Sequence, residues 1–260
     1  MKKIIVVKIG GSTFNSSDTT LKDLVKLQKT GWSLVVVHGG GDVVSRWLGK
    51  MNIVTPFVGG LRVTDKASLD VVIAVLAGLV NKELVAAINA LGGNAVGLSG
   101  VDGKIAEAKI KDEKLGRVGE VVNINTGLIQ SVIDRGFLPI IAPVSCALDG
   151  GVGAGLILNV NGDTLAGALA TALRADRLIF LTDVDGVKGK DGKIIEQLTA
   201  DRAKELIDSG IINKGMIPKV EAGILASRTA SITRIINGTK ASALMDEITG
   251  KSRGTGIVKA

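Results

Sequence analysis

The chain has very little of the chemistry that cysteine and histidine supply. Its 260 residues include one cysteine, Cys146, and one histidine, His38. A single cysteine excludes an intrachain disulfide, and one residue of each kind excludes a zinc site built from soft ligands. A nucleophilic thiol at Cys146 would have to use His38 as its base. We favour the interpretation of Cys146 as a small buried thiol.

Aromatic side chains and runs of like charge are also scarce. Tyrosine is absent, aromatic residues make up 2% of the chain, and 46% of the residues are hydrophobic. The formal net charge is +7, but lysine and arginine are dispersed, with no basic run of five. Because stacking aromatics are nearly missing, we expect no nucleic-acid partner. The positive charge instead favours a small anionic substrate or a well-solvated surface.

No apolar run in the sequence approaches the roughly 20 residues that span a membrane. The opening Met1-Lys2-Lys3 is similar to the start of a signal peptide, but Lys8 interrupts the apolar run that follows. That run is shorter than the roughly 7–15 residues of a signal-peptide core. We therefore expect a cytoplasmic protein with no membrane partner.

Strand-like and helix-like segments alternate along the chain, which predicts an α/β fold with a mostly parallel central sheet. The pattern predicts a strand at 138–143 that ends at Pro143, antiparallel hairpins that project from the sheet within 101–125, and a last edge strand at 254–258. An aliphatic helix at 67–91 has more apolar surface than one sheet face needs, which predicts a symmetric interface and a homodimer.

Two glycine-rich segments follow the first two predicted strands. Lys8, Gly10 and Gly11 close the strand that begins at Ile4, and His38-Gly39-Gly40-Gly41 follows the strand at 33–37. Ligands bind at the carboxyl ends of strands in open α/β sheets, and glycines there leave backbone N–H groups free for anions. The spacing is neither a P-loop nor a dinucleotide fingerprint. The pair predicts one site for phosphate or carboxylate oxygens.

Six motifs occur in an order that resembles the amino acid kinase family over essentially the whole chain. They are Lys8-Ile9-Gly10-Gly11, His38-Gly39-Gly40-Gly41, Gly60-Leu61-Arg62-Val63-Thr64-Asp65, Asn159-Val160-Asn161-Gly162-Asp163, Leu181-Thr182-Asp183-Val184-Asp185-Gly186 and Gly215-Met216-Ile217-Pro218-Lys219. The resemblance implies a three-layer αβα sandwich within a single domain, 1–260. It would have an amino-acid and dimerisation lobe at about 1–172 and an ATP-binding lobe at about 173–260.

The resemblance also implies an activity, that of the branch of the family that acts on N-acetyl-L-glutamate. Its γ-carboxylate would be phosphorylated by ATP to an acyl phosphate, the second step of arginine biosynthesis. Mg²⁺ would be carried by the ATP phosphates and water, with no protein ligand, which suits an ion that dehydrates reluctantly. The resemblance further implies that arginine-inhibited relatives carry an extra N-terminal helix. Because the first strand begins near Ile4, we expect no arginine inhibition.

The family pattern implies roles for individual residues. The residues implied in catalysis are Lys8 and Lys219, which would stabilise the transferring phosphoryl group, and Asp163, which would hold both lysines. The residues implied in substrate binding are Gly40, Gly41, Arg62 and Asn159. The residues implied in ATP binding are Gly10, Gly11, Thr182, Asp183, Val184, Gly186, Gly215 and Met216.

Two alternatives remain open at this stage. A related kinase phosphorylates aminoadipate attached to an acidic carrier protein, and the basic charge of this chain would suit such a carrier. The segments Gly59–Arg62 and Met216–Lys219 favour the acetylglutamate type instead. A non-catalytic nucleotide or amino-acid sensor on the same fold is disfavoured by the complete set of Lys8, Asp163 and Lys219.

Overall fold

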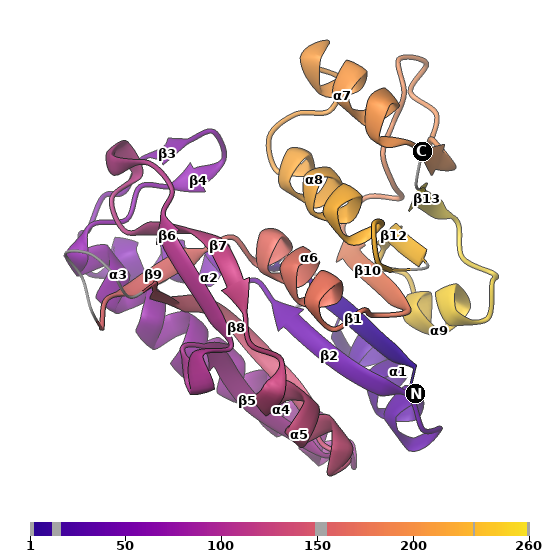
Figure 1. Ribbon diagram of the computed structural model, residues 1–260, viewed down its shortest axis with the longest axis horizontal. Coiled ribbons are helices and arrows are strands. Elements are labelled where there is room, and N and C mark those ends of the chain that lie inside the picture. Colours follow the sequence, from indigo (N-terminus) through magenta and orange to yellow (C-terminus); the bar gives the residue numbers. More distant parts are fainter. Residues whose placement is uncertain (1–2, 12–16, 149–154, 231, 259–260) are drawn as a thin grey trace.

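A computed structural model of the chain describes residues 3–11, 17–148, 155–230 and 232–258. Strands and helices alternate through most of this length (Figure 1). The strands are β1 (Ile4–Ile9), β2 (Ser33–His38), β3 (Phe57–Val58), β4 (Leu61–Arg62), β5 (Ala95–Gly100), β6 (Ala106–Ile110), β7 (Val118–Ile124), β8 (Leu138–Ala147), β9 (Ile157–Val160), β10 (Arg177–Thr182), β11 (Gln197–Leu198), β12 (Ile232–Asn237) and β13 (Gly254–Ile257). The helices are α1 (Ser17–Lys29), α2 (Gly41–Lys50), α3 (Lys66–Ile73), α4 (Asn81–Ala90), α5 (Gly127–Asp134), α6 (Gly162–Ala172), α7 (Ala200–Asp208), α8 (Met216–Ala226) and α9 (Ala243–Ile248), with a π-helical segment, η2 (Ala74–Val80), between α3 and α4.

Within the described residues, every strand except β3 and β4 belongs to one 11-stranded sheet, in the order β11-β13-β12-β10-β1-β2-β8-β6-β7-β9 with β5 also paired to β8. The centre of the sheet is parallel, from β12 through β10, β1 and β2 to β8. Antiparallel pairs, β12–β13, β6–β7 and β8–β9, lie toward both ends. The sheet is therefore mixed around a parallel centre.

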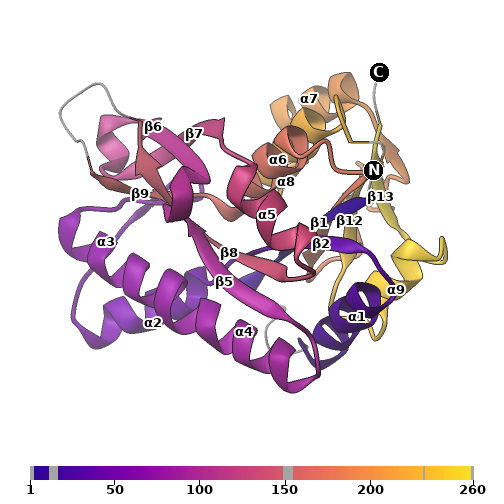
Figure 2. The same ribbon diagram turned by 60° about the horizontal axis from the view of Figure 1, so that its bottom comes forward.

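The central strands are buried on both faces. In β1, Ile5 and Val7 belong to one hydrophobic cluster, whereas Ile4 and Val6 belong to the other. This follows from the strand period of two residues, which sends neighbouring side chains to opposite faces. Helices α1, α2, α3, α4 and α9 supply the first cluster, and α5 to α8 supply the second. Figure 2 shows the two groups on opposite faces of the sheet.

Three sequence expectations about the sheet are wrong in detail. Strand β8 does not end at Pro143 but continues to Ala147. Pairing with β2 stops at Ile141 and the register with β5 shifts near the proline, so the missing N–H falls where the ladder is irregular. The β6–β7 hairpin lies within the sheet instead of projecting from it, and β13 is flanked by β11 and β12 instead of forming the edge.

The long aliphatic helix is present as the continuous run α3–η2–α4. By length and composition alone, Lys66–Ala90 could cross a membrane, contrary to the expectation from the sequence. Counting uninterrupted apolar residues does not reveal the length of this apolar helix, because Asp70 and Lys82 interrupt the apolar run. In the fold, one side of this helix, including Val72 and Leu76, is buried in the core beside the sheet.

Candidate active site

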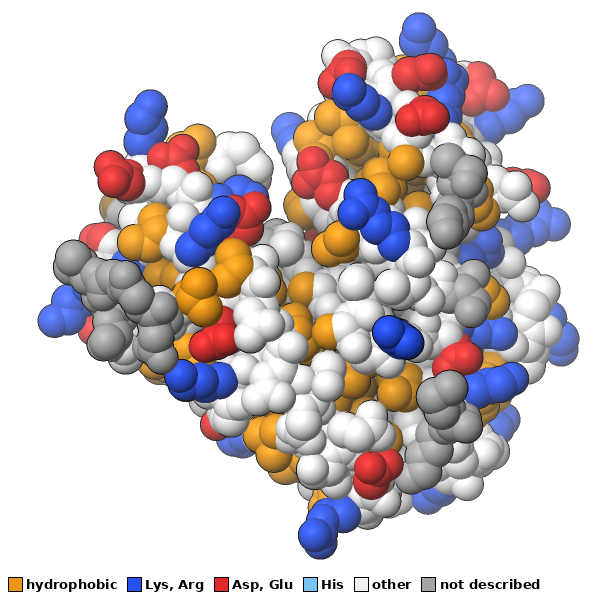
Figure 3. All heavy atoms as spheres, in the orientation of Figure 1, with side chains coloured by type: hydrophobic (Ala, Val, Ile, Leu, Met, Phe, Trp, Pro, Cys, Tyr) orange, Lys and Arg blue, Asp and Glu red, His pale blue; other side chains and the backbone are white. Residues whose placement is uncertain are grey.

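The carboxyl ends of β1, β2 and β10 open into one cavity of about 330 Å³. The space-filling view shows the molecule hollowed between the part that carries β3 and β4 and the part that carries α7 and α8 (Figure 3). Eleven of the fifteen residues predicted for the site line this cavity: Lys8, Gly10, Gly11, Gly40, Gly41, Arg62, Asn159, Asp163, Thr182, Asp183 and Lys219.

Backbone hydrogen bonds join the three loops at the floor of the cavity. The Gly10 N–H donates to the Leu181 carbonyl (3.2 Å), and the Gly39 N–H donates to the Ile9 carbonyl (2.9 Å). Gly40 has a φ of +146°, and a β-carbon there would lie 2.7 Å from Cδ2 of Leu76. Only glycine fits this backbone and this approach. The second glycine-rich segment is therefore fixed against η2.

Two lysines share one buried carboxylate in this cavity. Lys8 Nζ lies 2.8 Å from Oδ1 of Asp163, and Lys219 Nζ lies 2.9 Å from Oδ2. Lys8 and Asp163 are buried, and Lys219 makes a further hydrogen bond to the Gly215 carbonyl (3.1 Å). Lys219 lies in the first turn of α8, which begins at Met216. Each carboxylate oxygen thus holds one ammonium group at a defined place.

The charges in this cluster depend on one another. Burial raises the pKa of Asp163, but the ammonium groups of Lys8 and Lys219 outweigh it and hold the pKa below its ordinary value. Burial also lowers the pKa of Lys8, an effect that Asp163 opposes and Lys219 reinforces. The carboxylate is therefore the group that keeps a proton on the buried Lys8.

The start of α6 places the carboxylate. Asn161 is the N-cap, and its side-chain oxygen accepts from the N–H groups of Asp163 (2.8 Å) and Thr164 (3.1 Å). Asp163 therefore does not cap the helix and is free to face the lysines. A β-carbon at Gly162 would lie 3.3 Å from the His38 carbonyl oxygen and 3.6 Å from Cε of Lys8, so a small residue leaves room for the Lys8 chain.

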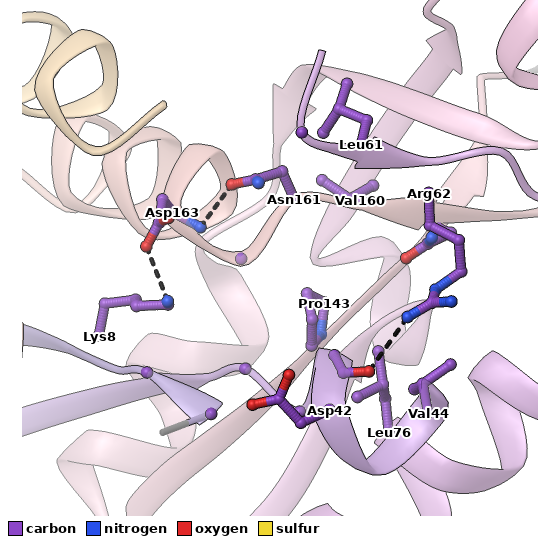
Figure 4. A pocket seen from close by; sticks show the side chains of 18 of the residues that line it. Lys8, Asp42, Val44, Leu61, Arg62, Leu76, Pro143, Val160, Asn161 and Asp163 are labelled. Atoms are coloured by element: carbon purple, nitrogen blue, oxygen red, sulfur yellow. Dashed lines mark hydrogen bonds and ion pairs between the residues drawn. The ribbon is translucent and has the colours of Figure 1, made fainter. Parts of the chain in front are cut away.

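Arg62 lies on strand β4, across the cavity from Lys8 (Figure 4). Its guanidinium donates to the Gly41 carbonyl (3.1 Å) and to the hydroxyls of Ser45 (2.6 Å) and Thr55 (2.8 Å), and it lies 4.6 Å from the centre of the Phe57 ring. These contacts fix the plane of a fork that matches a carboxylate.

Asn159 is linked to Arg62 by hydrogen bonds through Thr64, a residue whose role the sequence did not reveal. The Asn159 amide donates to the Thr64 hydroxyl (3.1 Å), which donates to the Arg62 carbonyl (2.9 Å). Ser45, Thr55 and Thr64 were missed as positioning residues because hydroxyls carry no sequence signature by themselves. Thr64, inside the quoted Gly60–Asp65 motif, was the one that could have been found.

Four residues predicted to bind ATP do not line the cavity: Val184, Gly186, Gly215 and Met216. Gly186 has a φ of +150° where the chain passes β13, and a β-carbon would lie 2.8 Å from Oγ1 of Thr255, so packing alone accounts for this glycine. The Val184 carbonyl accepts from the buried Thr182 hydroxyl (2.8 Å). Thr182 and Asp183 do reach the cavity.

Neither of the rare residues forms a nucleophile pair in the described structure. The Cys146 thiol is partly buried within β8 and donates to the Val101 carbonyl (3.6 Å). His38 contacts Gly39 and Asn81 instead. Within the described residues there is also no cluster of three or more histidine, cysteine or acidic side chains that could hold a metal ion.

Comparisons with known proteins agree with this geometry. Residues 3–237 match the model of the amino acid kinase family. The chain is 45% identical over 255 residues to the acetylglutamate kinase of Dehalococcoides mccartyi strain CBDB1, covering 98% of this chain and 94% of that protein. It is 44% identical over 267 residues to the acetylglutamate kinase of Caldanaerobacter subterraneus subsp. tengcongensis, covering 99% of this chain and 88% of that protein.

Solved structures show the same fold. The structure of smu.665 from Streptococcus mutans UA159 superposes with a TM-score of 0.84 at 31% identity, covering 99% of both chains. Carbamate kinase from Giardia lamblia bound to AMP-PNP gives a TM-score of 0.72 at 18% identity, covering 100% of this chain and 99% of that one, a likeness of fold alone. The match of the family model, the near full-length relatives and the shared fold together establish that the chain belongs to the amino acid kinase family.

Proposed function

We propose that the chain transfers the γ-phosphoryl group of ATP to the γ-carboxylate of N-acetyl-L-glutamate, the second step of arginine biosynthesis. Near full-length relatives at 41–45% identity are named acetylglutamate kinase. The observation that carries the proposal is the placing of two lysines on one buried Asp163, with the Arg62 fork on the opposite wall of the same cavity.

The two lysines suit the charge problem of this reaction. A carboxylate is already a nucleophile, so no general base is needed. The barrier is the approach of two anions and the charge that spreads over the transferring phosphoryl group. Lys8 comes from the sheet and Lys219 from α8, so the two ammonium groups would meet that group from two sides. Asp163 holds them without reorganisation during the reaction.

The opposite wall suits the amino-acid end of the substrate. The Arg62 fork would bind the α-carboxylate, and Asn159 would donate to the acetamido and carboxylate side. The N–H groups of Gly40 and Gly41 would donate to acceptor oxygens. Free glutamate would bring an ammonium group instead of the neutral acetamide. Asp163 is already paired with the two lysines, whereas Asp42 and Asp183 also line the cavity, so the assay with free glutamate tests whether either of these carboxylates accepts that ammonium group.

ATP would enter from the other side of the cavity. Gly10, Gly11, Thr182 and Asp183 would line the phosphate and ribose end. Val184 and Gly186 would flank it from the loop after β10, and Gly215 and Met216 from the start of α8. Mg²⁺ would be held by phosphate oxygens and water and would supply charge neutralisation. We assign about 1–172 to a substrate-binding and dimerisation lobe and about 173–260 to an ATP-binding lobe of a three-layer αβα sandwich, and we expect the enzyme to be cytoplasmic.

A coupled assay of ADP release tests the function directly. We expect turnover with N-acetyl-L-glutamate and little with free L-glutamate, N-acetylaminoadipate or carbamate, each offered with ATP and Mg²⁺. Equal or faster turnover of free glutamate would contradict the proposal. Preference for N-acetylaminoadipate would instead favour the aminoadipate branch of the family.

Arg62→Ala is expected to raise KM for N-acetyl-L-glutamate roughly 10-fold to 100-fold, since a hydrogen bond to a charged group is worth about 1.5–3 kcal/mol. The KM for ATP and kcat should change little. Arg62→Lys is the matched control, because it keeps the charge and loses the fork, and it should give an intermediate KM. A parent-like acceptor KM in Arg62→Ala would remove Arg62 from the substrate site.

We further propose a homodimer built on the exposed side of the α3–η2–α4 helix. Leu79 of η2 is 37% exposed, and Leu91, which follows α4 directly, is also 37% exposed, whereas the core-facing residues of the helix are buried. Light scattering should give twice the mass of one chain, and Leu79→Glu should shift it toward one chain. A hexamer, or a parent protein that is monomeric at micromolar concentration, would contradict this arrangement.

A further inference from the structure

The lone histidine forms a buried network behind the wall of the cavity. His38 is completely buried at the end of β2. Its Nδ1 lies 2.7 Å from the Gly39 carbonyl oxygen, and its Nε2 lies 3.2 Å from Nδ2 of Asn81. Burying polar groups costs free energy unless each of them is hydrogen-bonded. The mechanism outlined for phosphoryl transfer gives this buried polar network no role.

The partners of the network settle its protonation. A carbonyl oxygen only accepts, so the proton of the imidazole sits on Nδ1 and points at Gly39. Asn81 Nδ2 donates to the Ile140 carbonyl (2.8 Å), and its Oδ1 accepts from the Lys82 ammonium (3.0 Å), so the amide cannot be reversed. The two hydrogens of Nδ2 are shared among the Ile140 carbonyl, the Leu98 carbonyl (3.3 Å) and Nε2 of His38, so Nε2 faces a donor group. The neutral Nδ1–H form of His38 is the form that presents a donor to Gly39 and an acceptor to Asn81.

The charge environment agrees with the neutral form. Burial, together with the positive charges of Lys8 on β1 and Lys82 on α4, lowers the pKa of His38 to about 4 against the opposing effect of the hydrogen bond to Gly39. Protonation would place a second donor on Nε2, directly against the donor of Asn81. At neutral pH the imidazole is thus a fixed hydrogen-bond donor to one carbonyl.

That carbonyl belongs to the peptide that joins Gly39 to Gly40. In a trans peptide the C=O and the following N–H point in opposite directions. Because His38 holds the Gly39 oxygen on the buried side, the Gly40 N–H points the other way. The Gly40 nitrogen lies 3.5 Å from the place where a β-carbon of Gly11 would stand, and both glycines line the cavity. Within the described part of the chain this N–H makes no hydrogen bond.

The π-helical segment holds the same peptide from another side. Cδ2 of Leu76 and Cγ2 of Val80, both in η2, lie 2.7 Å and 3.5 Å from the place where a β-carbon of Gly40 would stand. Asn81 follows η2 directly, so this π-helical segment also positions the Asn81 side-chain amide that contacts His38. π-helical turns of this kind are common at functional sites. The peptide is therefore clamped by the imidazole and by the helix at once.

We propose that His38 is a positioning residue, which with Asn81 holds the Gly39–Gly40 peptide so that the Gly40 N–H donates to an oxygen of the acceptor carboxylate or the transferring phosphoryl group. The inference rests on the proposed function of the cavity. It assigns the buried polar network to transition-state binding, whereas a structural role would require only that the core be filled.

Two substitutions separate these roles. In His38→Asn the side-chain amide nitrogen can take the place of Nδ1 and donate to Gly39. In His38→Gln, which fills the space better, the amide reaches the place of Nε2 and leaves the Gly39 carbonyl without its donor. We expect kcat/KM for N-acetyl-L-glutamate to fall at least 10-fold in His38→Gln and clearly less in His38→Asn, the scale of losing one hydrogen bond at a charged group.

The single histidine also allows a direct observation on the parent protein. With ¹⁵N-labelled histidine, NMR should show one imidazole, in the Nδ1–H form, unchanged between pH 5.5 and 8. An Nε2–H form, or titration near the ordinary pKa, would overturn the proposal without any variant. The thermal unfolding midpoints of His38→Asn and His38→Gln show whether a loss of activity follows from a loss of stability.

The outcomes are distinguishable. Activity that follows the unfolding midpoints, or parent-like kcat/KM in both variants, would overturn the positioning role. If the parent fails to turn over N-acetyl-L-glutamate, the proposed function fails instead. If it turns over and His38→Gln alone is impaired, with both variants folded, the clamp on the Gly39–Gly40 peptide is supported.

Discussion

Replacing Lys8 or Lys219 with alanine is expected to lower kcat about 100-fold or more, the scale of removing one preorganised charge donor. Both ammonium groups stand ready in the cavity, at 2.8 Å and 2.9 Å from the oxygens of Asp163. The measurement is kcat at saturating ATP and N-acetyl-L-glutamate. The KM values should move much less than kcat, because the charge to be stabilised is largest in the transition state.

The matched control is Lys22→Ala, which removes an exposed lysine of α1 and should leave kcat within about two-fold of the parent, as surface substitutions away from special features usually do. The double variant of Lys8 and Lys219 should lose less than the product of the two single losses, because both lysines act through one carboxylate. Near-parent kcat in Lys8→Ala would show that the assigned mechanism is wrong.

The sequence predicted the parts of this site that depend on local pattern. The sequence predicted a strand that begins at Ile4, and it predicted that Lys8 and the glycines after that strand lie at its carboxyl end. Both expectations are confirmed in the fold, where Lys8 and Gly10 reach the cavity. The alternation of strands and helices likewise predicted the parallel centre of the sheet. These features are written within a few neighbouring residues, so a single sequence contains them.

Other parts could not be predicted because they arise between distant segments. Asn81 meets His38 across 43 residues of sequence, and Asn159 meets Thr64 across 95. The π-helical turn of η2 has no pattern that separates it from an α-helix of the same aliphatic residues. The continuation of β8 past Pro143 depends on an irregular ladder that only the assembled sheet supplies.

Asp163→Asn is expected to destabilise the protein by about 3–5 kcal/mol, the range for removing one partner from a buried ion pair. The neutral amide can accept from one lysine, but its NH₂ group would face the other, and Lys8 has almost no access to water. Urea unfolding measures the change. Adding Lys8→Met should recover part of the loss by removing the unpaired buried charge. A double variant less stable than Asp163→Asn would contradict this account.

The same substitution should change how activity depends on pH. Burial lowers the pKa of Lys8 and Asp163 opposes that effect, so losing the carboxylate lowers the pKa further. A lysine with a lowered pKa is already deprotonated at a pH where an ordinary lysine is still charged. We therefore expect kcat of Asp163→Asn to be reduced about 100-fold or more near pH 8 and to recover in part toward pH 6, whereas the parent shows no such gain. Asp163→Glu keeps the charge and should retain the parent profile while losing kcat through displacement of the carboxylate. Parallel profiles for the parent and Asp163→Asn would mean that the proton on Lys8 does not depend on this carboxylate.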